Sequence, residues 1–269
     1  MQHAIEQMKT HSAQLESGHF FNPSAGVYLK SRLDVILQRG RIRVGTTGDY
    51  KPYSYLDSHT HRYEGYDIDV ARHLGDQLGV HVEFIKTSWP TIMEDLRKDC
   101  FDISMGGISR NLERQKIAHL TRPYVKDGKA PLMRYEDHMK FTCLMDIDQP
   151  GVKIGLNPGG TNERFVRKHV KNADILICED NLMIPGMVAE GKVDVMITDH
   201  VEASLYAKKD ERLYAALGDN PFTRSEKVYM LHRGDLDYQN WIALWMEEME
   251  EEGTMERLKV KWGLNQSVR

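Results

Sequence analysis

The fold class follows from one stretch, Val193-Asp194-Val195-Met196-Ile197-Thr198-Asp199-His200-Val201-Glu202. Its apolar, β-branched half at 193–197 predicts a buried strand, and the polar turn after it predicts that the strand leads into a helix. Asp199 and Glu202 then stand at the carboxyl end of the strand, where open α/β sheets bind ligands. A receptor can use the first acid to hold an ammonium group, whereas a second acid in the same crevice suggests proton transfer.

The same alternation of strand and helix extends outward from this stretch. In the first half, the pattern predicts strands at 41–46, 80–85 and 101–105 and helices at 31–37, 68–78 and 91–98. In the second half it predicts strands at 152–156, 174–177 and 193–197, with helices after Gly160, at 183–190 and from about Val201. Repeated β-α-β units predict parallel sheets with right-handed crossovers.

We therefore predict an α/β protein with two lobes, each a mostly parallel sheet flanked by helices, and a ligand cleft between them. Lobe 1 is expected to span 31–130, with 229–269 returning to it through a strand at 227–231, and lobe 2 to span 131–228. Residues 1–30 form a polar N-terminal extension. The aromatic residues of the last helices lie at helical spacing, which is typical of packing residues.

Composition excludes several classes of partner. The 269 residues are 41% hydrophobic and 28% charged, with a net charge of -4, and no basic block is present. Nucleic acid is therefore not an expected partner. No apolar run approaches the ~20 residues that cross a bilayer, so we do not expect membrane insertion. Three cysteines without a C-x-x-C pair indicate neither a zinc site nor a complete disulfide framework.

Polar residues cluster where the predicted strands end. Arg114 presents two parallel donors to a carboxylate, while backbone N–H groups at Gly106-Gly107 and after Gly160 suit an anionic oxygen. Aromatic side chains at Tyr50 and Trp89 provide walls for a ring. Each residue alone is explained by a turn or a helix cap, but their shared position favours one site. The expected ligand is a small cyclic carboxylate with another polar substituent, since Asp49 and Asp199 can accept hydroxyl or ammonium donors.

Three other kinds of chemistry lack their sequence patterns. No G-x-x-x-x-G-K-[ST] phosphate loop is present, and no G-x-S-x-G elbow indicates a serine triad. No H-E-x-x-H motif or comparable histidine spacing indicates a metal site, so we expect none.

Further motifs carry a resemblance to a known family. The segment 65–71, Gly-Tyr-Asp-Ile-Asp-Val-Ala, resembles a segment of the type II periplasmic solute-binding proteins of the polar amino acid kind. Ser109 followed five residues later by Arg114 resembles the carboxylate clamp of that family, and 253–262 resembles its C-terminal motif. The resemblance covers about 31–264 and implies the two-lobed fold of these proteins.

More specific segments are similar to the cyclohexadienyl dehydratases, enzymes built on this binding-protein fold. They are 46–52, 87–90, 111–115, 123–129, 148–152 and 157–163. The resemblance implies conversion of prephenate, L-arogenate or both to phenylpyruvate or L-phenylalanine, without a cofactor. It implies that Glu202 is the catalytic acid, assisted by Lys129 and Asn157. It also implies a substrate site formed by Asp49, Tyr50, Trp89, Gly107, Ser109, Arg114, Thr161 and Asp199. The chain departs from the expected pattern at Gly106, where a serine would add a hydroxyl contact.

Two functions of different classes stay open at this point. One is a dehydratase of aromatic amino acid biosynthesis, and the other is the receptor subunit of an ABC transporter, which does no chemistry. The resemblance implies a periplasmic protein whose signal peptide is missing from this sequence, with a cytoplasmic location as the alternative. A homo-oligomer is also left open, as is the choice between prephenate and arogenate. We expect the lobes to close on the ligand by a hinge motion.

Overall fold

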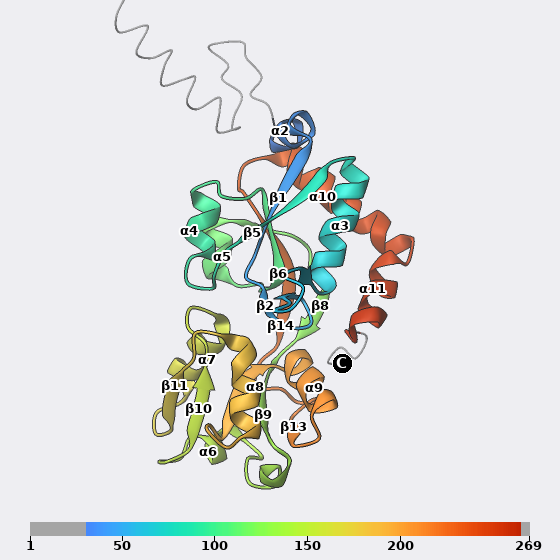
Figure 1. Ribbon diagram of the computed structural model, residues 1–269. Coiled ribbons are helices and arrows are strands. Elements are labelled where there is room, and N and C mark those ends of the chain that lie inside the picture. The colour runs from blue at the N-terminus through green and yellow to red at the C-terminus, as the bar shows by residue number, and fades with distance from the viewer. Residues whose placement is uncertain (1–30, 265–269) are drawn as a thin grey trace, which may run out of the picture.

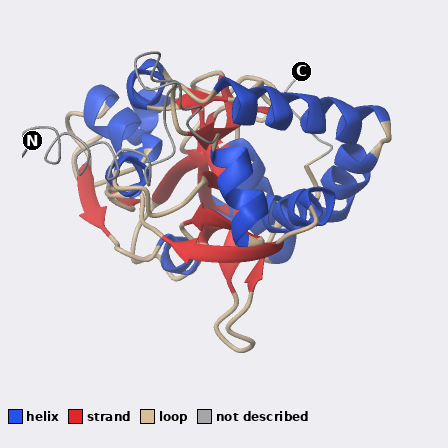
Figure 2. Ribbon diagram, turned by 90° about the horizontal axis from the view of Figure 1, so that it is seen from above, coloured by secondary structure: helices blue, strands red, loops and turns tan. Residues whose placement is uncertain are grey.

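The computed structural model describes residues 31–264, so the predicted extension at 1–30 lies outside the described residues. Two larger sheets lie one above the other, each with its own helices (Figure 1). Viewed from above, the strands run through the middle of the molecule and the helices lie around them (Figure 2). This is the predicted two-lobed α/β architecture, with sheets flanked by helices.

The upper sheet has the strand order β5-β1-β6-β14-β7, with β8 also paired to β14. Its strands are β1 Arg41–Thr46, β5 His81–Lys86, β6 Ile103–Ser109, β7 His119–Leu120, β8 Val125–Asp127 and β14 Ser225–Leu231. β1 is parallel to β5 and β6, whereas β14 is antiparallel to β6. The predicted return of the chain to this sheet is therefore made by an antiparallel strand.

The lower sheet has the order β11-β10-β12-β9-β13. Its strands are β9 Lys129–Arg134, β10 Lys153–Leu156, β11 Asp174–Ile177, β12 Val195–Asp199 and β13 Leu213–Ala215. β10, β11 and β12 are parallel, and β9 is antiparallel to β12. A small third sheet contains β2 Asp49–Tyr50, β3 Ser54–Leu56 and β4 Tyr63–Glu64.

Helices follow the strands in the predicted alternation. They are α2 Arg32–Arg39, α3 Tyr66–Leu78, α4 Ile92–Arg97, α5 Leu112–Ile117, α6 Leu144–Ile147, α7 Thr161–His169, α8 Ile184–Ala189, α9 His200–Lys209, α10 Leu236–Glu251 and α11 Thr254–Trp262, with short 3₁₀ turns η1 Tyr135–Asp137 and η2 Asn181–Met183. In α2, the Ser31 side chain caps the first turn and left-handed Gly40 ends the helix.

β6 continues past its predicted end at Met105 as far as Ser109. Gly106 and Gly107 have φ values of +148° and +72°, and a side chain at Gly107 would overlap the Tyr50 ring. These two glycines let the strand pass through an irregular stretch, where the register with β14 shifts, without breaking. β12 likewise continues past its predicted end at Ile197 to include Asp199.

The last two helices pack largely as predicted. Trp245, Met249 and Met255 are buried in the core of the upper lobe, and Trp241 and Trp262 pack against it. Leu244 differs from the prediction because its side chain is 55% exposed.

The chain changes sheets at Gly128, which lies between β8 of the upper sheet and β9 of the lower one. A Cβ atom at Gly128 would overlap the backbone carbonyl oxygen of Thr223, on the segment that leads back to β14. The Thr223 hydroxyl also accepts a hydrogen bond of 3.0 Å from the backbone N–H of Lys129. The two crossing segments thus touch each other. The lobe limits 31–130, 131–228 and 229–269 stay a prediction.

Candidate active site

A small cavity lies between the two larger sheets. Both lobes line the cavity, with Tyr50, Trp89, Gly107, Ser109 and Lys227 from one side and Asn157, Gly160, Thr161, Asn162, Asn181 and Asp199 from the other. The structure therefore places seven of the predicted site residues in the lining of one cavity. They are Tyr50, Trp89, Gly107, Ser109, Asn157, Thr161 and Asp199.

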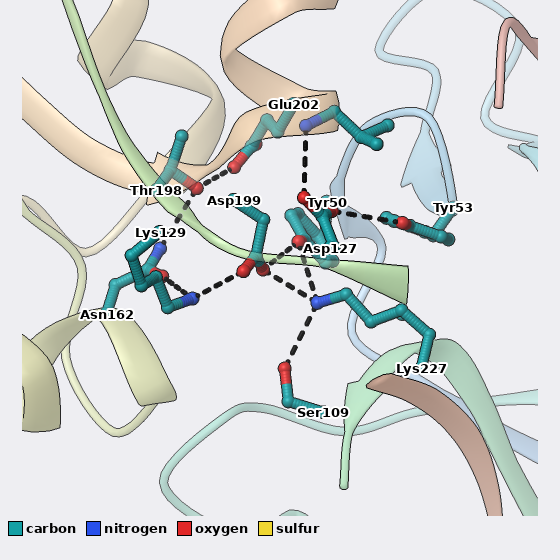
Figure 3. A network of polar contacts seen from close by, with 12 residues as sticks. Tyr50, Tyr53, Ser109, Asp127, Lys129, Asn162, Thr198, Asp199, Glu202 and Lys227 are labelled. Carbon is teal, nitrogen blue, oxygen red and sulfur yellow. Dashed lines mark hydrogen bonds and ion pairs between the residues drawn. The ribbon is translucent and has the colours of Figure 1, made fainter. Parts of the chain in front are cut away.

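Asp199 is the centre of a buried group of charges (Figure 3). Its Oδ1 is 2.9 Å from the Nζ of Lys129, and its Oδ2 is 2.6 Å from the Nζ of Lys227. Lys129 faces Asp199 because the two residues are register partners on antiparallel β9 and β12. Burial alone would raise the pKa of Asp199, but the two lysines hold it well below its ordinary value.

Lys227 joins the two lobes at this group. It belongs to β14 of the upper sheet and is fully buried. Besides Asp199, its Nζ lies 3.0 Å from the Tyr50 hydroxyl and 3.0 Å from the Ser109 hydroxyl. The Tyr50 hydroxyl also donates a hydrogen bond to Asp199. Lys227 was not among the predicted site residues. Its one signal in the sequence was a charged residue at the start of a predicted strand, 227–231, that is otherwise apolar.

Glu202 lies in the first turn of α9 and has no exposed surface. Its carboxyl does not line the cavity directly. The Nδ2 of Asn181, a residue that does line it, donates a hydrogen bond of 2.9 Å to Oε1 of Glu202. Burial raises the pKa of Glu202 to about 8; the Thr198 hydroxyl opposes this shift and the charge of Asp199 adds to it. The carboxyl therefore carries its proton at neutral pH.

A chain of hydrogen bonds connects Lys129 to Glu202. The ammonium of Lys129 can only donate, so it contacts the Oδ1 of Asn162. The Nδ2 of Asn162 then faces the Thr198 hydroxyl oxygen at 3.2 Å. Because that oxygen accepts a hydrogen bond, the Thr198 hydroxyl is free to donate to Oε2 of Glu202. Both carboxyl oxygens of Glu202 therefore accept a hydrogen bond, Oε2 from Thr198 and Oε1 from Asn181.

Arg114 is buried next to the cavity without a charge partner. It is 7% exposed, its Nη1 donates to the Ser109 carbonyl oxygen at 2.7 Å, and its guanidinium lies 6.0 Å from the centre of the Trp89 ring. Within residues 31–264 it forms no ion pair with a carboxylate. Burial lowers the pKa of Arg114 to about 10, so it stays charged at neutral pH. A buried cation without a counter-ion is suited to an anionic ligand.

Two of the predicted contacts differ from the structure. The Gly107 N–H is not free for an anion, because it donates to Oδ2 of Asp67 at 2.6 Å. Asp49 does not line the cavity, and its Oδ1 accepts from the indole N–H of Trp89 at 3.0 Å. Both differences have the same cause: a buried donor or acceptor is satisfied by the nearest protein partner when one is within reach.

Two amide oxygens in the cavity wall have no partner. They are the Oδ1 atoms of Asn157 and Asn181, whose side chains are 5% and 2% exposed. The orientation of Asn181 follows from its contacts, because its Nδ2 faces the carbonyl oxygen of Asp49 at 3.1 Å. Buried acceptors without partners are costly. A ligand hydroxyl would satisfy them.

Among residues 31–264, no cluster of three or more His, Cys, Asp or Glu side chains is placed to hold a metal ion. No helix in that range is long and apolar enough to cross a membrane.

Comparison with known proteins assigns this architecture. The profile of the bacterial extracellular solute-binding proteins, family 3, matches residues 42–265. A cyclohexadienyl dehydratase of Pseudomonas aeruginosa is 42% identical over 233 residues, which are 87% of this chain and 86% of that protein. An L-cystine-binding protein of Escherichia coli K12 is 25% identical over 243 residues, covering 88% of this chain and 90% of that one.

Solved structures include both kinds of relative. The crystal structure of an ancestral cyclohexadienyl dehydratase is 52% identical, with a TM-score of 0.55, and covers 88% of this chain and 98% of that one. An ancestral amino acid-binding protein, described as a precursor of cyclohexadienyl dehydratase, is 34% identical with a TM-score of 0.80 and covers 86% and 99%. A dehydratase and an amino acid-binding protein thus share this fold.

Proposed function

Because the chain belongs to the bacterial extracellular solute-binding proteins of family 3, we propose that it captures its ligand as those proteins do and then converts it. The proposed activity is that of a cyclohexadienyl dehydratase, which makes phenylpyruvate from prephenate, L-phenylalanine from L-arogenate, or both. The relative in P. aeruginosa supports this choice. A periplasmic location goes with the proposal, since the family is described as extracellular.

One observation carries the proposal: Glu202 is a fully buried carboxylic acid with a pKa of about 8 at the edge of the cavity. A carboxyl that keeps its proton at neutral pH is suited to general acid catalysis. A receptor for an amino acid needs no such group. The cost of burying Glu202 therefore has a functional explanation.

The substrate is held by charges that the site already contains. Arg114 provides a buried cation for one carboxylate, and Lys129 provides a second cation on the opposite lobe. The unpartnered Oδ1 atoms of Asn157 and Asn181 are placed to accept a hydrogen bond from the ring hydroxyl. The side chains of Trp89 and Tyr50 form a wall for the substrate ring. They are in edge-to-face contact, with their ring centres 5.8 Å apart.

The reaction then needs one proton. The bond between the ring and its carboxylate breaks, and CO₂ leaves while that electron pair enters the ring. The bond between the ring and its hydroxyl breaks at the same time, and the oxygen takes the proton of Glu202 to leave as water. Aromatisation provides the driving force, and the resulting Glu202 carboxylate is reprotonated from solvent. Transfer of this proton requires the Asn181 amide to move aside or a water molecule to bridge, because Asn181 lies between Glu202 and the cavity.

The hydrogen-bond chain from Lys129 supports this step. It directs the Thr198 hydroxyl onto Oε2 and so fixes the orientation of the Glu202 carboxyl. Lys129 and Asn162 act here as positioning residues for Glu202. They hold one orientation of the acid before the substrate arrives, which lowers the reorganisation required during the reaction.

The second candidate is a transport receptor without catalysis. The similarity to an L-cystine-binding protein and to an ancestral amino acid-binding protein favours it. The two functions are separated by incubating the purified protein with prephenate in EDTA and following phenylpyruvate formation, beside a Glu202→Gln variant. We expect turnover by the parent and its loss in the variant. No turnover by the parent, together with a higher melting temperature in the presence of an amino acid, would favour the receptor.

A further inference from the structure

We propose that Asp67 is a positioning residue for the ligand cavity, because its ionised carboxylate holds the backbone of Gly107 in the cavity wall. Asp67 lies in the first turn of α3 and has no exposed surface. It belongs to the segment 65–71, which the proposed function does not use. Where it concerns substrate binding, the inference rests on the proposed function, but the contact with Gly107 does not depend on it.

Asp67 accepts hydrogen bonds from three segments of the upper lobe. Its Oδ2 accepts from the N–H of Gly107 at 2.6 Å and from the Tyr124 hydroxyl at 2.7 Å. Its Oδ1 accepts from the Tyr229 hydroxyl at 3.2 Å. Gly107 belongs to β6, Tyr124 immediately precedes β8, and Tyr229 belongs to β14. One carboxylate therefore ties β6 to the two strands that lie next to the crossing segments.

The position of Gly107 affects the cavity on two sides. The Tyr50 ring packs directly on the Gly107 backbone, so closely that a Cβ atom at Gly107 would overlap the ring, and both residues line the cavity. Two residues further along β6, the carbonyl oxygen of Ser109 accepts from the guanidinium of Arg114 at 2.7 Å. A shift of β6 at Gly107 would therefore displace both the aromatic wall and the support of the buried cation.

The charge of Asp67 strengthens these contacts. All three hydrogen bonds come from uncharged donors, and no cation within residues 31–264 forms an ion pair with this carboxylate. Burial raises the pKa of Asp67 to about 6, and the hydrogen bonds from Tyr124, Gly107 and Tyr229 oppose this shift. The carboxylate is therefore ionised at neutral pH. A protonated carboxyl would hold the Gly107 N–H less firmly, because charge-assisted hydrogen bonds are roughly twice as strong as neutral ones.

The titratable side chains around Asp67 are tyrosines, which stay neutral in the range where Asp67 changes charge. The Tyr124 ring stacks between the rings of Tyr66 and Tyr229, with ring centres 5.5 Å and 4.7 Å apart. The carbonyl oxygen of Tyr53 accepts from the backbone N–H of Asp67 at 2.9 Å. Burial raises the pKa of all four phenols above their ordinary value. A change between pH 5 and 7 in this cluster is therefore assigned to Asp67.

The first test follows the amide signal of Gly107 by nuclear magnetic resonance between pH 5 and 8, in the parent and in Asp67→Asn. Asparagine has the same size as aspartate, but its amide does not ionise. We expect the parent signal to shift with a midpoint near pH 6 and the variant signal to stay constant. A Gly107 signal that does not titrate in the parent overturns the inference. This titration of the parent requires neither a ligand nor a folded variant.

The second test measures kcat and KM for prephenate between pH 5 and 7, with the rate without enzyme subtracted. In the parent, KM should rise roughly three- to tenfold as the pH falls, as the weakening of one hydrogen bond predicts. The value of kcat should stay nearly constant, because the contacts of Asp67 lie in the upper lobe and Glu202 lies in α9 of the lower one. Asp67→Asn should show the higher KM at every pH.

The matched control is Asp69→Asn, which removes the other acid of the same helical turn. Asp69 pairs with Arg72 and Lys261, away from the cavity, so this variant should keep the pH profile of the parent. A constant KM in the parent, or a rise that persists in Asp67→Asn, overturns the inference and leaves the dehydratase function intact. If none of these proteins turns over prephenate, the proposed function is wrong, and the titration of the Gly107 signal decides whether Asp67 holds the cavity wall.

Discussion

Replacing Glu202 by glutamine should weaken catalysis and strengthen the fold at the same time. Glutamine has the same length, and its amide can still contact Asn181 and Thr198. In the parent, the folded-state pKa of about 8 lies above the ordinary value of 4.5. As pH rises between these values, the unfolded chain releases this proton and the folded chain does not. The free energy of unfolding therefore falls by ~1.4 kcal/mol per pH unit between these two pKa values. The loss is absent below the lower pKa and complete above the higher one.

The magnitude follows from that window. At pH 7 the free energy of unfolding of the parent is ~3 kcal/mol lower than that of a chain whose residue 202 cannot ionise. This difference grows until about pH 8. We expect the free energy of unfolding of Glu202→Gln, measured with urea, to exceed that of the parent by about 3–5 kcal/mol at pH 8 and to be nearly equal at pH 5. At neutral pH its kcat should be lower by ~10²–10⁴-fold.

The control for this experiment is Glu211→Gln, which removes an exposed acid beyond the end of the same helix. It should change neither the turnover nor the pH dependence of stability. A Glu202→Gln variant that gained no stability at pH 8 would show that Glu202 is ionised in the folded parent. A variant that kept its turnover would show that another group supplies the proton.

Three further changes test other parts of the site. Arg114→Met should raise KM by ~10–100-fold in steady-state kinetics, because it removes the buried cation proposed to hold a carboxylate; an unchanged KM would mean that the carboxylate binds elsewhere. In the parent, kcat/KM should fall as pH rises through about 8, where Glu202 loses its proton, and Thr198→Val should move this fall to higher pH because it removes a hydrogen bond that lowers the pKa. A fall at the same pH in both proteins would count against Glu202 as the titrating group. Gly128→Ala should lower the free energy of unfolding by ~1–3 kcal/mol, since its Cβ atom would overlap the Thr223 carbonyl oxygen; unchanged stability would show that the crossing segments separate easily.

The fold was largely predictable because its signals are local. The strand at 41–46 and the strand at 174–177 occur with the predicted bounds, and the helix predicted at 68–78 ends at Leu78 as predicted. Apolar periodicity and glycine act over a few residues, so they can be read along the chain. β9 was not predicted, because Pro131 interrupts its pattern and the strand depends on β12 and β13 on either side.

The residues that form the candidate site were largely predictable, but their hydrogen-bond partners were not. Acids, amides and Arg114 at strand ends pointed to a cleft for a small carboxylate, and the cavity contains most of those residues. The sequence did not indicate which hydrogen-bond partner each N–H and each carboxylate would have. The Gly107 N–H, expected to face the ligand, is bonded to Asp67, which lies 40 residues away in the sequence.

By itself, the sequence determined that the chain forms two α/β lobes and that acids gather at the ends of their strands. The tertiary structure alone decided that Lys227 reaches Asp199 and that Tyr50, 149 residues from Asp199 in the sequence, donates to the same carboxylate. The physical reason is that periodicity reports which face of an element is buried, a property of neighbouring residues. The charge state of a buried acid depends instead on which groups the other lobe brings within about 3 Å, and that approach leaves no pattern along the chain.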